Sequence, residues 1–363
     1  MSVRFKDIFN TLRKNQNKSH RDDHEKTCDG LFQIFQSVYD LDEKALYITK
    51  KQAKSLGIKI DEMALVDCDG EYTLRRREGS FRPLSIETLN ACPLDENDED
   101  AKELSQRVRG WSNMASYLED NRCTVCDTLG SELDQLANTS RRVGAGENAR
   151  SSKLLKLNTW RPSGGLCDDI VHSYYAGMLK FNVGVTQYFF VQASYLSAYR
   201  REYEPHVSII LDHYYQGRED ISHAELSTIL AAMVTQMEHN KLQSHSITPF
   251  LLISFMDSFH GRILQAHTTN DGLVIQKSRL CSFRTQQEFD KSMSLFLRWM
   301  ASERVGNTHQ QVQLDPSKGE PADVKAIRKA MKGFFITTPA DGRTGDVPTQ
   351  PPSSYLQAVQ VTR

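Results

Sequence analysis

Three apolar, β-branched runs near the carboxyl terminus constrain the fold of this chain more than any other feature. They cover residues 247–256, 262–268 and 273–277, and the polar segments 257–261 and 270–272 separate them. Apolar runs of strand length with Asp, Asn and Gly between them are typical of adjacent strands joined by tight turns. The sequence therefore predicts a three-stranded antiparallel meander at 247–277.

Most of the remaining ordered chain carries helical periodicity. One apolar stripe repeats at spacings of four and three residues between Leu104 and Leu118, and an acidic stretch at 95–100 precedes it, as suits a helix start. Capping-box spacing predicts further helix starts at Thr124 with Asp127, Ser222 with Glu225, and Thr285 with Glu288.

The most apolar stretch, 170–199, contains one charged residue, Lys180, and predicts two buried helices. Pro205 predicts the start of another helix, which ends at Gly217. A last helix, basic on one face, is predicted at 322–335. Taken together, these patterns predict an α+β fold that is predominantly helical, with a small three-stranded antiparallel meander near the C-terminus.

Shifts in composition divide the chain into four parts. Residues 1–26 form a basic, amphipathic segment and linker, and 27–97 a small mixed α/β region with two short strands around Asp69-Gly70. Residues 98–335 form the main helical domain with the meander at 247–277, and a basic connector at 138–165 is expected to be a surface loop. The Pro-containing tail 336–363 is predicted to be disordered.

Composition excludes several classes of protein. The 45 Lys and Arg residues balance 46 Asp and Glu residues, which argues against a nucleic-acid footprint. The chain has no run of 18 strongly apolar residues, so we expect no membrane span. Charges at Arg4, Lys6 and Asp7 interrupt any secretory signal, and seven irregularly spaced cysteines show no disulfide framework. We therefore expect a soluble, intracellular, cytoplasmic protein, with a nuclear location left open.

The block ITPFLLISFMDSFHGRILQAH, with LVIQKSRLCSF and LFLRWM after it, resembles a segment found in a group of uncharacterised proteins from filamentous fungi. The resemblance covers 247–300 only. It implies a fungal source and no function, and no catalytic residue is carried over from it.

Asp168 and His172 are the candidate catalytic residues. They follow Arg161-Pro-Ser-Gly-Gly165 and would lie on one side of a helix, where they could ligate a metal or form an Asp–His base pair. A glycine-rich helix start could also bind phosphate, but two aspartates in its first turns would repel an anion. The competing interpretation is that Asp168 and Asp169 only stabilise the helix dipole. An Asp-Asp-x-x-His stretch also resembles the aspartate-rich metal motif of terpene cyclases, but it lacks the final aspartate and a second metal motif.

The cysteines and histidines suggest weaker sites. Cys123 and Cys126 form a lone CxxC at a helix start, where a thiolate would be stabilised, but no paired metal ligands accompany them. His20, His24 and Cys28 recur every four residues, and seven histidines fall between His206 and His267 without a metal-binding motif. Scattered surface and capping roles suit these residues better.

Three motifs are near-misses. A calcium loop ending at Glu225 would need Gly where Glu219 stands. The segment at Gly144 lacks the Gly-Lys-Ser/Thr of a phosphate-binding loop. A metal-nuclease pattern ending at Lys277 would need a carboxylate where Ile275 stands.

The leading hypothesis is an interaction or scaffold protein without catalytic activity. An accessory enzyme of fungal metabolism is the alternative, with an aromatic-lined pocket from 170–203 and Asp168 and His172 in it. A weak nucleic-acid binder is the least favoured. The sequence identifies no cofactor, no cofactor-binding residue and no metal ligand, and it leaves both a protein partner and a small molecule open. The nucleic-acid hypothesis would use the basic residues Arg75, Arg76, Arg77, Arg141, Arg142, Lys325, Arg328, Lys329 and Lys332.

Overall fold

The computed structural model describes residues 23–41, 46–63, 79–121, 124–144, 150–164, 169–172, 175, 189–197, 204–214, 216–239, 242–310 and 312. All of them belong to one compact unit, Met1–Gly319, and the second unit, Glu320–Arg363, contains no described residue. The predictions for 1–22, for the strands around Asp69-Gly70, for helix 322–335 and for the tail 336–363 therefore lie outside the described residues.

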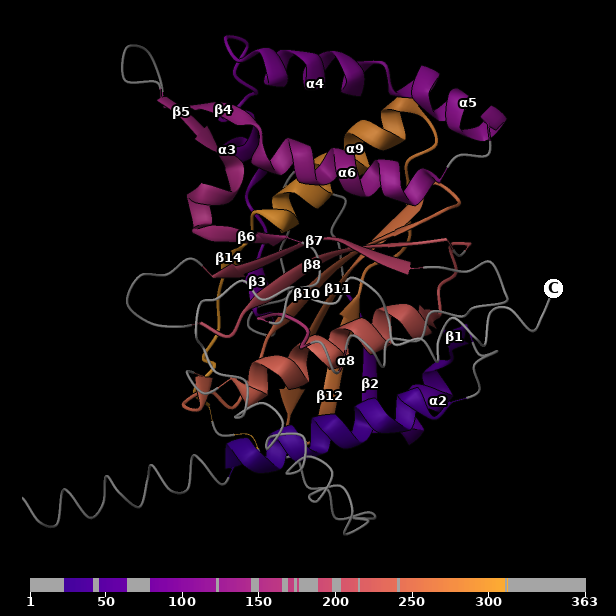
Figure 1. Ribbon diagram of the computed structural model, residues 1–363, viewed down its shortest axis with the longest axis vertical. Helices are drawn as coiled ribbons and strands as arrows, with labels where there is room; N and C mark the ends of the chain where they lie inside the picture. The colour runs from indigo at the N-terminus through magenta and orange to yellow at the C-terminus, as the bar shows by residue number, and fades with distance from the viewer. Residues whose placement is uncertain are drawn as a thin grey trace, which may run out of the picture. The chain divides into compact units, whose positions relative to one another are not determined.

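A mixed eight-stranded sheet forms the centre of the unit (Figure 1). Seven strands follow the order β2-β12-β11-β10-β8-β7-β6, and β13 pairs with β11. β2 and β12 are parallel, as are β10 and β8, and the other pairs are antiparallel. The strands are β2 (Ile58–Glu62), β6 (Trp160–Gly164), β7 (Phe189–Ser197), β8 (Val207–His213), β10 (Phe250–Met256), β11 (His260–Thr269), β12 (Gly272–Lys277) and β13 (Cys281–Ser282).

The predicted fold class is wrong. The meander β10-β11-β12 exists, but it is part of the large mixed sheet rather than a small addition to a helical domain. Residues predicted as the helix from Pro205 to Gly217 form β8, in which all seven residues are buried. A strand covered on both faces carries a continuous apolar run, and such a run has no alternation to distinguish it from a buried helix.

The aromatic stretch 170–199 and the connector 138–165 also contain strands. β7 occupies 189–197, where the second buried helix was expected, and the rest of that stretch is described only at 170–172 and 175. The connector holds strands β4 (Ser140–Val143) and β5 (Arg150–Lys153), the 3-10 helix η2 (Leu154–Asn158) and β6. It is therefore structured where it is described, and its β6 strand closes one edge of the sheet.

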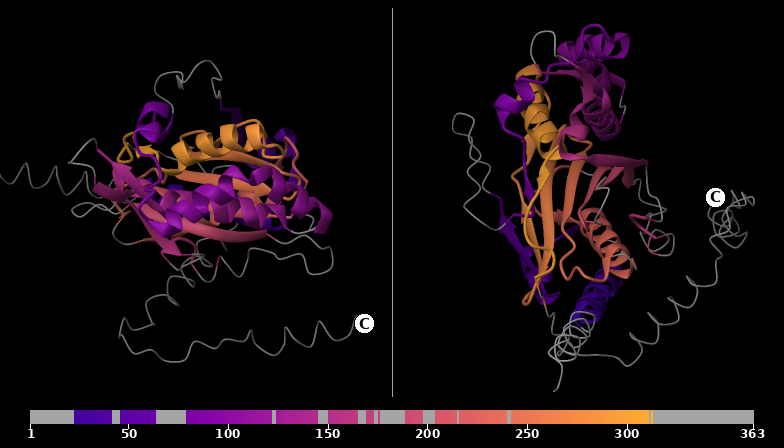
Figure 2. Two further views of the ribbon diagram at one scale, coloured as in Figure 1. Left: turned by 90° about the horizontal axis from the view of Figure 1, so that it is seen from above. Right: turned by 90° about the vertical axis from the view of Figure 1, so that its left-hand side faces the viewer.

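Helices cover both faces of the sheet. α6 (Val125–Asn138) and α9 (Gln286–Met300) lie over one face, with α4 (Glu99–Arg109) and α5 (Trp111–Asn121) outside them, and α8 (His223–Glu238) covers the other face (Figures 1 and 2). The helix 23–39 packs on the far side of α8, where His24 contacts the Met237 carbonyl, so α8 is buried along most of its length.

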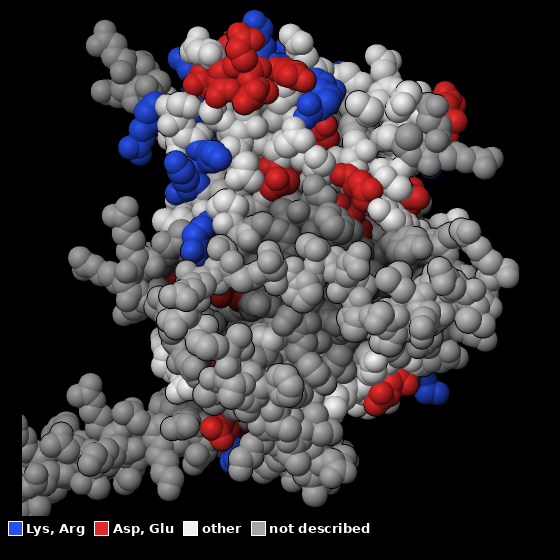
Figure 3. Space-filling model, in the orientation of Figure 1, with Lys and Arg blue, Asp and Glu red and all other residues white. Residues whose placement is uncertain are grey.

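Local helix signals were largely confirmed. Capping boxes form at Ser222 with Glu225 and at Thr285 with Glu288. The acidic stretch precedes α4, with Asp98 as its N-cap, and Figure 3 shows acidic side chains gathered over α4. Thr124 is the N-cap of α6, but its side chain bonds Asp127 instead of the backbone, so the predicted capping box is absent there. The single helix expected from 104 to 118 is interrupted at Gly110.

Short elements complete the described part of the chain. β1 pairs with β9 just before α8, and β3 pairs with β14 after α9. They are β1 (Tyr47–Ile48), α2 (Lys50–Ser55), β3 (Phe81–Arg82), α3 (Ile86–Asn90), β9 (Ile221–Ser222) and β14 (Glu303–Arg304).

No helix in the described ranges is both long enough and apolar enough to cross a membrane.

Candidate functional site

The strand directions bring four strand ends to one edge of the sheet. Because β2, β12, β10 and β8 all point the same way, their last residues, Glu62, Lys277, Met256 and His213, lie at the same edge. α8 follows β8, so its first turn returns at this edge too. Ligands of open α/β sheets bind outside the carboxyl ends of the strands. We call this the carboxyl edge.

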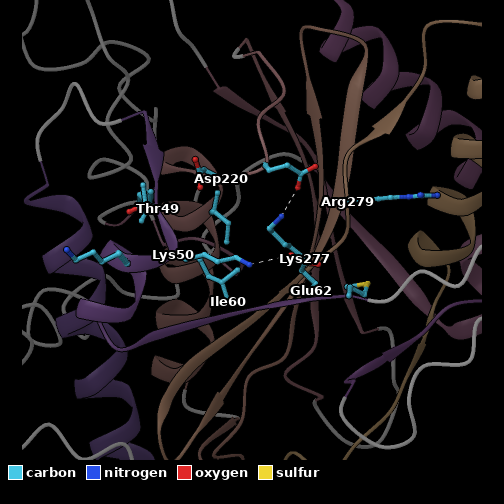
Figure 4. A pocket seen from close by; sticks show the side chains of 12 residues that line it. Thr49, Lys50, Ile60, Glu62, Asp220, Lys277 and Arg279 are labelled. Atoms are coloured by element: carbon cyan, nitrogen blue, oxygen red, sulfur yellow. Dashed lines mark hydrogen bonds and ion pairs between the residues drawn. The ribbon is translucent and has the colours of Figure 1, made fainter.

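A pocket of about 760 Å³ opens at the carboxyl edge, and we call it the edge pocket (Figure 4). Three chain segments that are far apart in the sequence supply its walls: the β1–α2–β2 region, the loop before α8, and the end of β12. Its lining combines four cationic, three acidic and four apolar side chains with one hydroxyl. They are Lys50, Lys51, Lys277 and Arg279, then Glu62, Glu219 and Asp220, then Ile48, Ile60, Met63 and Ile221, and Thr49.

Lys277 is the buried charge of this pocket. Strand alternation places it on the same face of β12 as Ile275, and only 6% of its side chain is exposed. Its Nζ donates to Oε2 of Glu219 at 2.8 Å, whereas the Glu219 side chain is 64% exposed. Figure 4 shows Lys277 in the middle of the group, beside the ion pair between Lys50 and Glu62. The ammonium of Lys277 is therefore held by a partner that faces water.

Glu219 is held as a carboxylate. Partial burial raises its pKa, but the hydrogen bond and the charge of Lys277 outweigh that effect, so the pKa lies below the usual value of a glutamate. The second oxygen, Oε1, accepts the backbone N–H of Leu280 at 3.5 Å. Both oxygens of this carboxylate thus face donors of the β12 end.

Arg262 ties the loop that carries Glu219 to the sheet. The buried guanidinium donates to the carbonyls of Arg218, Glu219 and Asp220 at 3.0, 3.1 and 2.8 Å. Its remaining donors bond both carboxylate oxygens of Glu225 in the first turn of α8. All five N–H groups of Arg262 are used, so the backbone of this pocket wall is rigidly placed.

Glu225 stays charged in this buried setting. Burial raises its pKa, but the positive charge of Arg262 outweighs that effect, so the pKa lies well below the usual value of a glutamate. The carboxylate also accepts the N–H of Ser222 in the capping box. Glu225 therefore caps α8, as the sequence predicted, and also binds Arg262, which holds the pocket wall in place.

Ser254, His213 and Glu225 have the composition of a hydrolase triad but not its connectivity. The Ser254 hydroxyl lies 2.8 Å from Nε2 of His213, and Glu225 Oε1 lies 3.8 Å from the same nitrogen. A triad needs the acid on the other ring nitrogen and a serine that substrate can reach. All three residues are fully buried, so a substrate cannot reach the serine. The group belongs to the buried network around Arg262 and is not arranged for acyl transfer.

A second polar cluster lies at the carboxyl edge on the other face of the sheet, the face that α6 covers. Asp212 of β8 is fully buried, and neither carboxylate oxygen has a hydrogen-bond partner among the described residues. Burial, together with the charge of Asp127, raises its pKa well above the usual value. Gly130 of α6 makes room for it, because a Cβ at that position would lie 2.3 Å from Oδ1 of Asp212.

Cys126 belongs to this second cluster. Burial and the nearby carboxylates of Asp212, Asp127 and Asp257 raise the pKa of its thiol. The thiolate that a helix start was expected to stabilise is therefore not favoured, since burial and the surrounding acids outweigh the helix amides. Cys123 lies outside the described residues, so the CxxC pair itself is not described.

The structure describes only one member of the predicted pair Asp168 and His172. Asp168 lies outside the described residues, and His172 follows a turn rather than lying in a helix. The His172 backbone N–H donates to Thr235 of α8 at 3.0 Å, which places this segment against the helix. The pair stays a prediction.

Several of the other histidine and arginine candidates have structural partners. Both ring nitrogens of His24 face backbone carbonyls, of His245 and Met237, and the His245 and His309 rings stack. Arg141, a candidate for nucleic-acid binding, is buried and donates to the carbonyls of Cys92 and Leu136. No three His, Cys, Asp or Glu side chains of the described ranges are grouped as metal ligands, and His20 is not among those ranges.

Sequence reasoning missed Lys277, Glu219 and Arg262 as site residues. One signal was present: Arg262 and Lys277 are cations within or at the end of apolar strand runs, where a charge is costly unless it is paired. Their partners come from distant segments, so the pairing itself is not readable from the chain. Comparison with models of protein families, with curated proteins and with solved structures finds no match to the chain.

Proposed function

We propose that the chain is a non-enzymatic interaction protein that takes an anionic group of a partner molecule into the edge pocket. The observation that carries this proposal is the buried ammonium of Lys277, whose one side-chain partner in the described part of the chain, Glu219, is largely exposed. Burying an ammonium costs free energy unless an anion compensates it. A glutamate that faces water offsets only a small part of the cost of burying the Lys277 ammonium, and an anion from a ligand would offset more of it.

The lining charges support an anionic ligand. The pocket contains one more cationic than acidic side chain. Glu62 and Glu219 are already paired with Lys50 and Lys277, so two of the three acids are neutralised locally. The excess charge and the paired acids together favour an incoming negative group.

The apolar lining supports a ligand with a carbon body. Ile48, Ile60, Met63 and Ile221 line the same pocket as the charged side chains. Binding sites combine apolar walls with a few placed polar groups that orient the ligand. An acidic side chain on a peptide segment, with its methylene groups against these walls, has this combination.

The test is a titration with an end-blocked oligoglutamate peptide, followed by isothermal calorimetry. An end-blocked oligoglutamine peptide is the neutral probe. We expect the wild-type chain to bind oligoglutamate and not oligoglutamine. The variant Lys277→Met should weaken this binding by about tenfold to 150-fold, the range for a hydrogen bond to a charged group.

Lys59→Met is the matched control variant. Lys59 pairs with Asp61 at 2.7 Å, close to the Lys277–Glu219 distance, but its side chain is exposed and does not line the edge pocket. Equal losses in both variants would contradict the proposal, as would no binding to the wild type. If Lys277→Met does not fold, Lys51→Gln at the exposed pocket rim should still weaken binding, by a smaller factor.

A further inference from the structure

We infer that the Glu219 carboxylate occupies the position beside Lys277 that a ligand carboxylate would take, and we call this position the anchor. A carboxylate of the partner molecule then replaces Glu219 at the anchor. This inference rests on the proposed function and names the chemical class of its ligand. The ligand class is a carboxylate, from either an acidic side chain or a chain terminus.

The contacts of Glu219 describe what the anchor accepts. One oxygen of its carboxylate accepts from Lys277 Nζ at 2.8 Å, and the other accepts from the Leu280 N–H at 3.5 Å. The two donors therefore suit a planar group with two acceptor oxygens. A ligand carboxylate can reproduce both bonds, so exchange leaves the buried ammonium compensated.

The backbone of Glu219 is fixed while its side chain is not. Arg262 holds the carbonyl of Glu219 and those of its two neighbours in the loop. The side chain, in contrast, is 64% exposed. Rotation about its own bonds can therefore release Lys277 without moving the loop, and an ion pair with one exposed partner is weak enough to exchange.

The neighbouring acids favour a carboxylate over a phosphate. Glu62 and Asp220 line the same pocket. Replacing the Glu219 carboxylate with another carboxylate leaves the charge at the anchor unchanged. Glu62 is paired with Lys50, but no described cation forms an ion pair with Asp220, so the extra negative charge of a phosphate dianion beside Asp220 would be unfavourable.

The experiment compares the wild type with Glu219→Gln and Glu219→Ala. Four probes are titrated: N-acetylglutamate amide carries a side-chain carboxylate, N-acetylglycine a terminal carboxylate, N-acetylglycinamide none, and inorganic phosphate is the alternative anion. Affinities and the amide resonance of Leu280 are followed by NMR. Both Glu219 variants should bind at least one carboxylate probe about fivefold more tightly than the wild type, the upper factor for an exposed ion pair.

The Leu280 amide distinguishes exchange from a general effect. It should shift in Glu219→Ala, where its acceptor is lost, and return toward the wild-type position when the carboxylate probe binds. Glu62→Gln is the matched control, since it removes another pocket carboxylate that pairs with Lys50. An equal gain in affinity in Glu62→Gln would overturn the inference, because the gain would then come from net charge alone.

The remaining outcomes separate this inference from the proposed function. Carboxylate binding by the wild type that depends on Lys277, with no gain in either Glu219 variant, overturns the exchange and leaves the proposed function standing. A larger gain for phosphate than for either carboxylate overturns the ligand class. If no probe and no oligoglutamate binds any of these proteins, the proposed function fails as well. If Glu219→Ala does not fold, Glu219→Gln keeps an acceptor for Lys277 and gives the same comparison.

Discussion

Asp212 should make the stability of this protein fall as the pH rises, and Asp212→Asn should remove that dependence. The side chain is fully buried, and neither carboxylate oxygen is hydrogen bonded within the described part of the chain. Burial raises its pKa well above the usual value, so the folded chain binds a proton there that the unfolded chain has already released. Asparagine has nearly the same shape and does not titrate.

The sign and the size follow from proton linkage. Between the ordinary aspartate pKa of about 3.9 and the raised value, the folded state holds one more proton than the unfolded state, so rising pH favours unfolding. A full proton of difference lowers the free energy of unfolding by about 1.4 kcal/mol per pH unit. Below about pH 3.9 both states are protonated, and the effect disappears.

The assay is urea unfolding at a series of pH values above about 4, followed by tryptophan fluorescence. The quantity of interest is the difference in the free energy of unfolding between Asp212→Asn and wild type, because other titrating groups cancel in it. We expect this difference to increase with pH in favour of the variant, with a slope of up to about 1.4 kcal/mol per pH unit. A difference that stays constant over the whole series would refute the argument that Asp212 is protonated in the fold.

Three further predictions test other parts of the structure. Gly130→Ala should destabilise the protein by about 1–3 kcal/mol, because the new Cβ would meet the Asp212 carboxylate, and thermal unfolding in an Asp212→Ala background should show a smaller loss. Arg262→Met should cost about 3–5 kcal/mol in urea unfolding, since it leaves Glu225 buried without its cation, and a cost below about 1 kcal/mol would contradict this. Burial lowers the pKa of His206 to about 4, so its NMR titration should have a midpoint near that pH, and this residue should reduce stability as the pH falls from about 6.5 toward 4.

The local signals of the sequence predicted the later part of the chain well. The meander strands and their turn at Asn270-Asp271 form as expected, and Gly272 adopts φ +130°, which a side chain rarely tolerates. The capping boxes of α8 and α9 also form. These features depend on residues within a few positions of one another, so the chain itself carries the signal.

The central strands could not be predicted in the same way. β8 is buried on both faces, so its apolar run matches a buried helix as well as a strand. Its strand state depends on pairing with β7 on one side and with β10 on the other. The pairing with β10 joins segments that α8 separates in the chain, so no local pattern indicates it.

The candidate site shows the same division. From the sequence alone, we consider Lys277 only as the end of a failed nuclease pattern and Glu219 only as part of a failed calcium loop. The structure joins the two residues at 2.8 Å and places Arg262 behind the loop that carries Glu219. The predicted pair Asp168 and His172 relied instead on helical spacing, and the described residues 169–172 do not form a helix.

The helix starts at Ser222 and Thr285, the turn before Gly272 and the apolar runs can be read from the chain, because capping and turn geometry act over short stretches of backbone. Which runs became central strands, which charges were buried and which partners compensate them emerged only in the folded protein. The physical reason is that burial and ion pairing depend on segments far apart in the chain. Lys277 at 6% exposure, held by Glu219 from 58 residues away, is the clearest example.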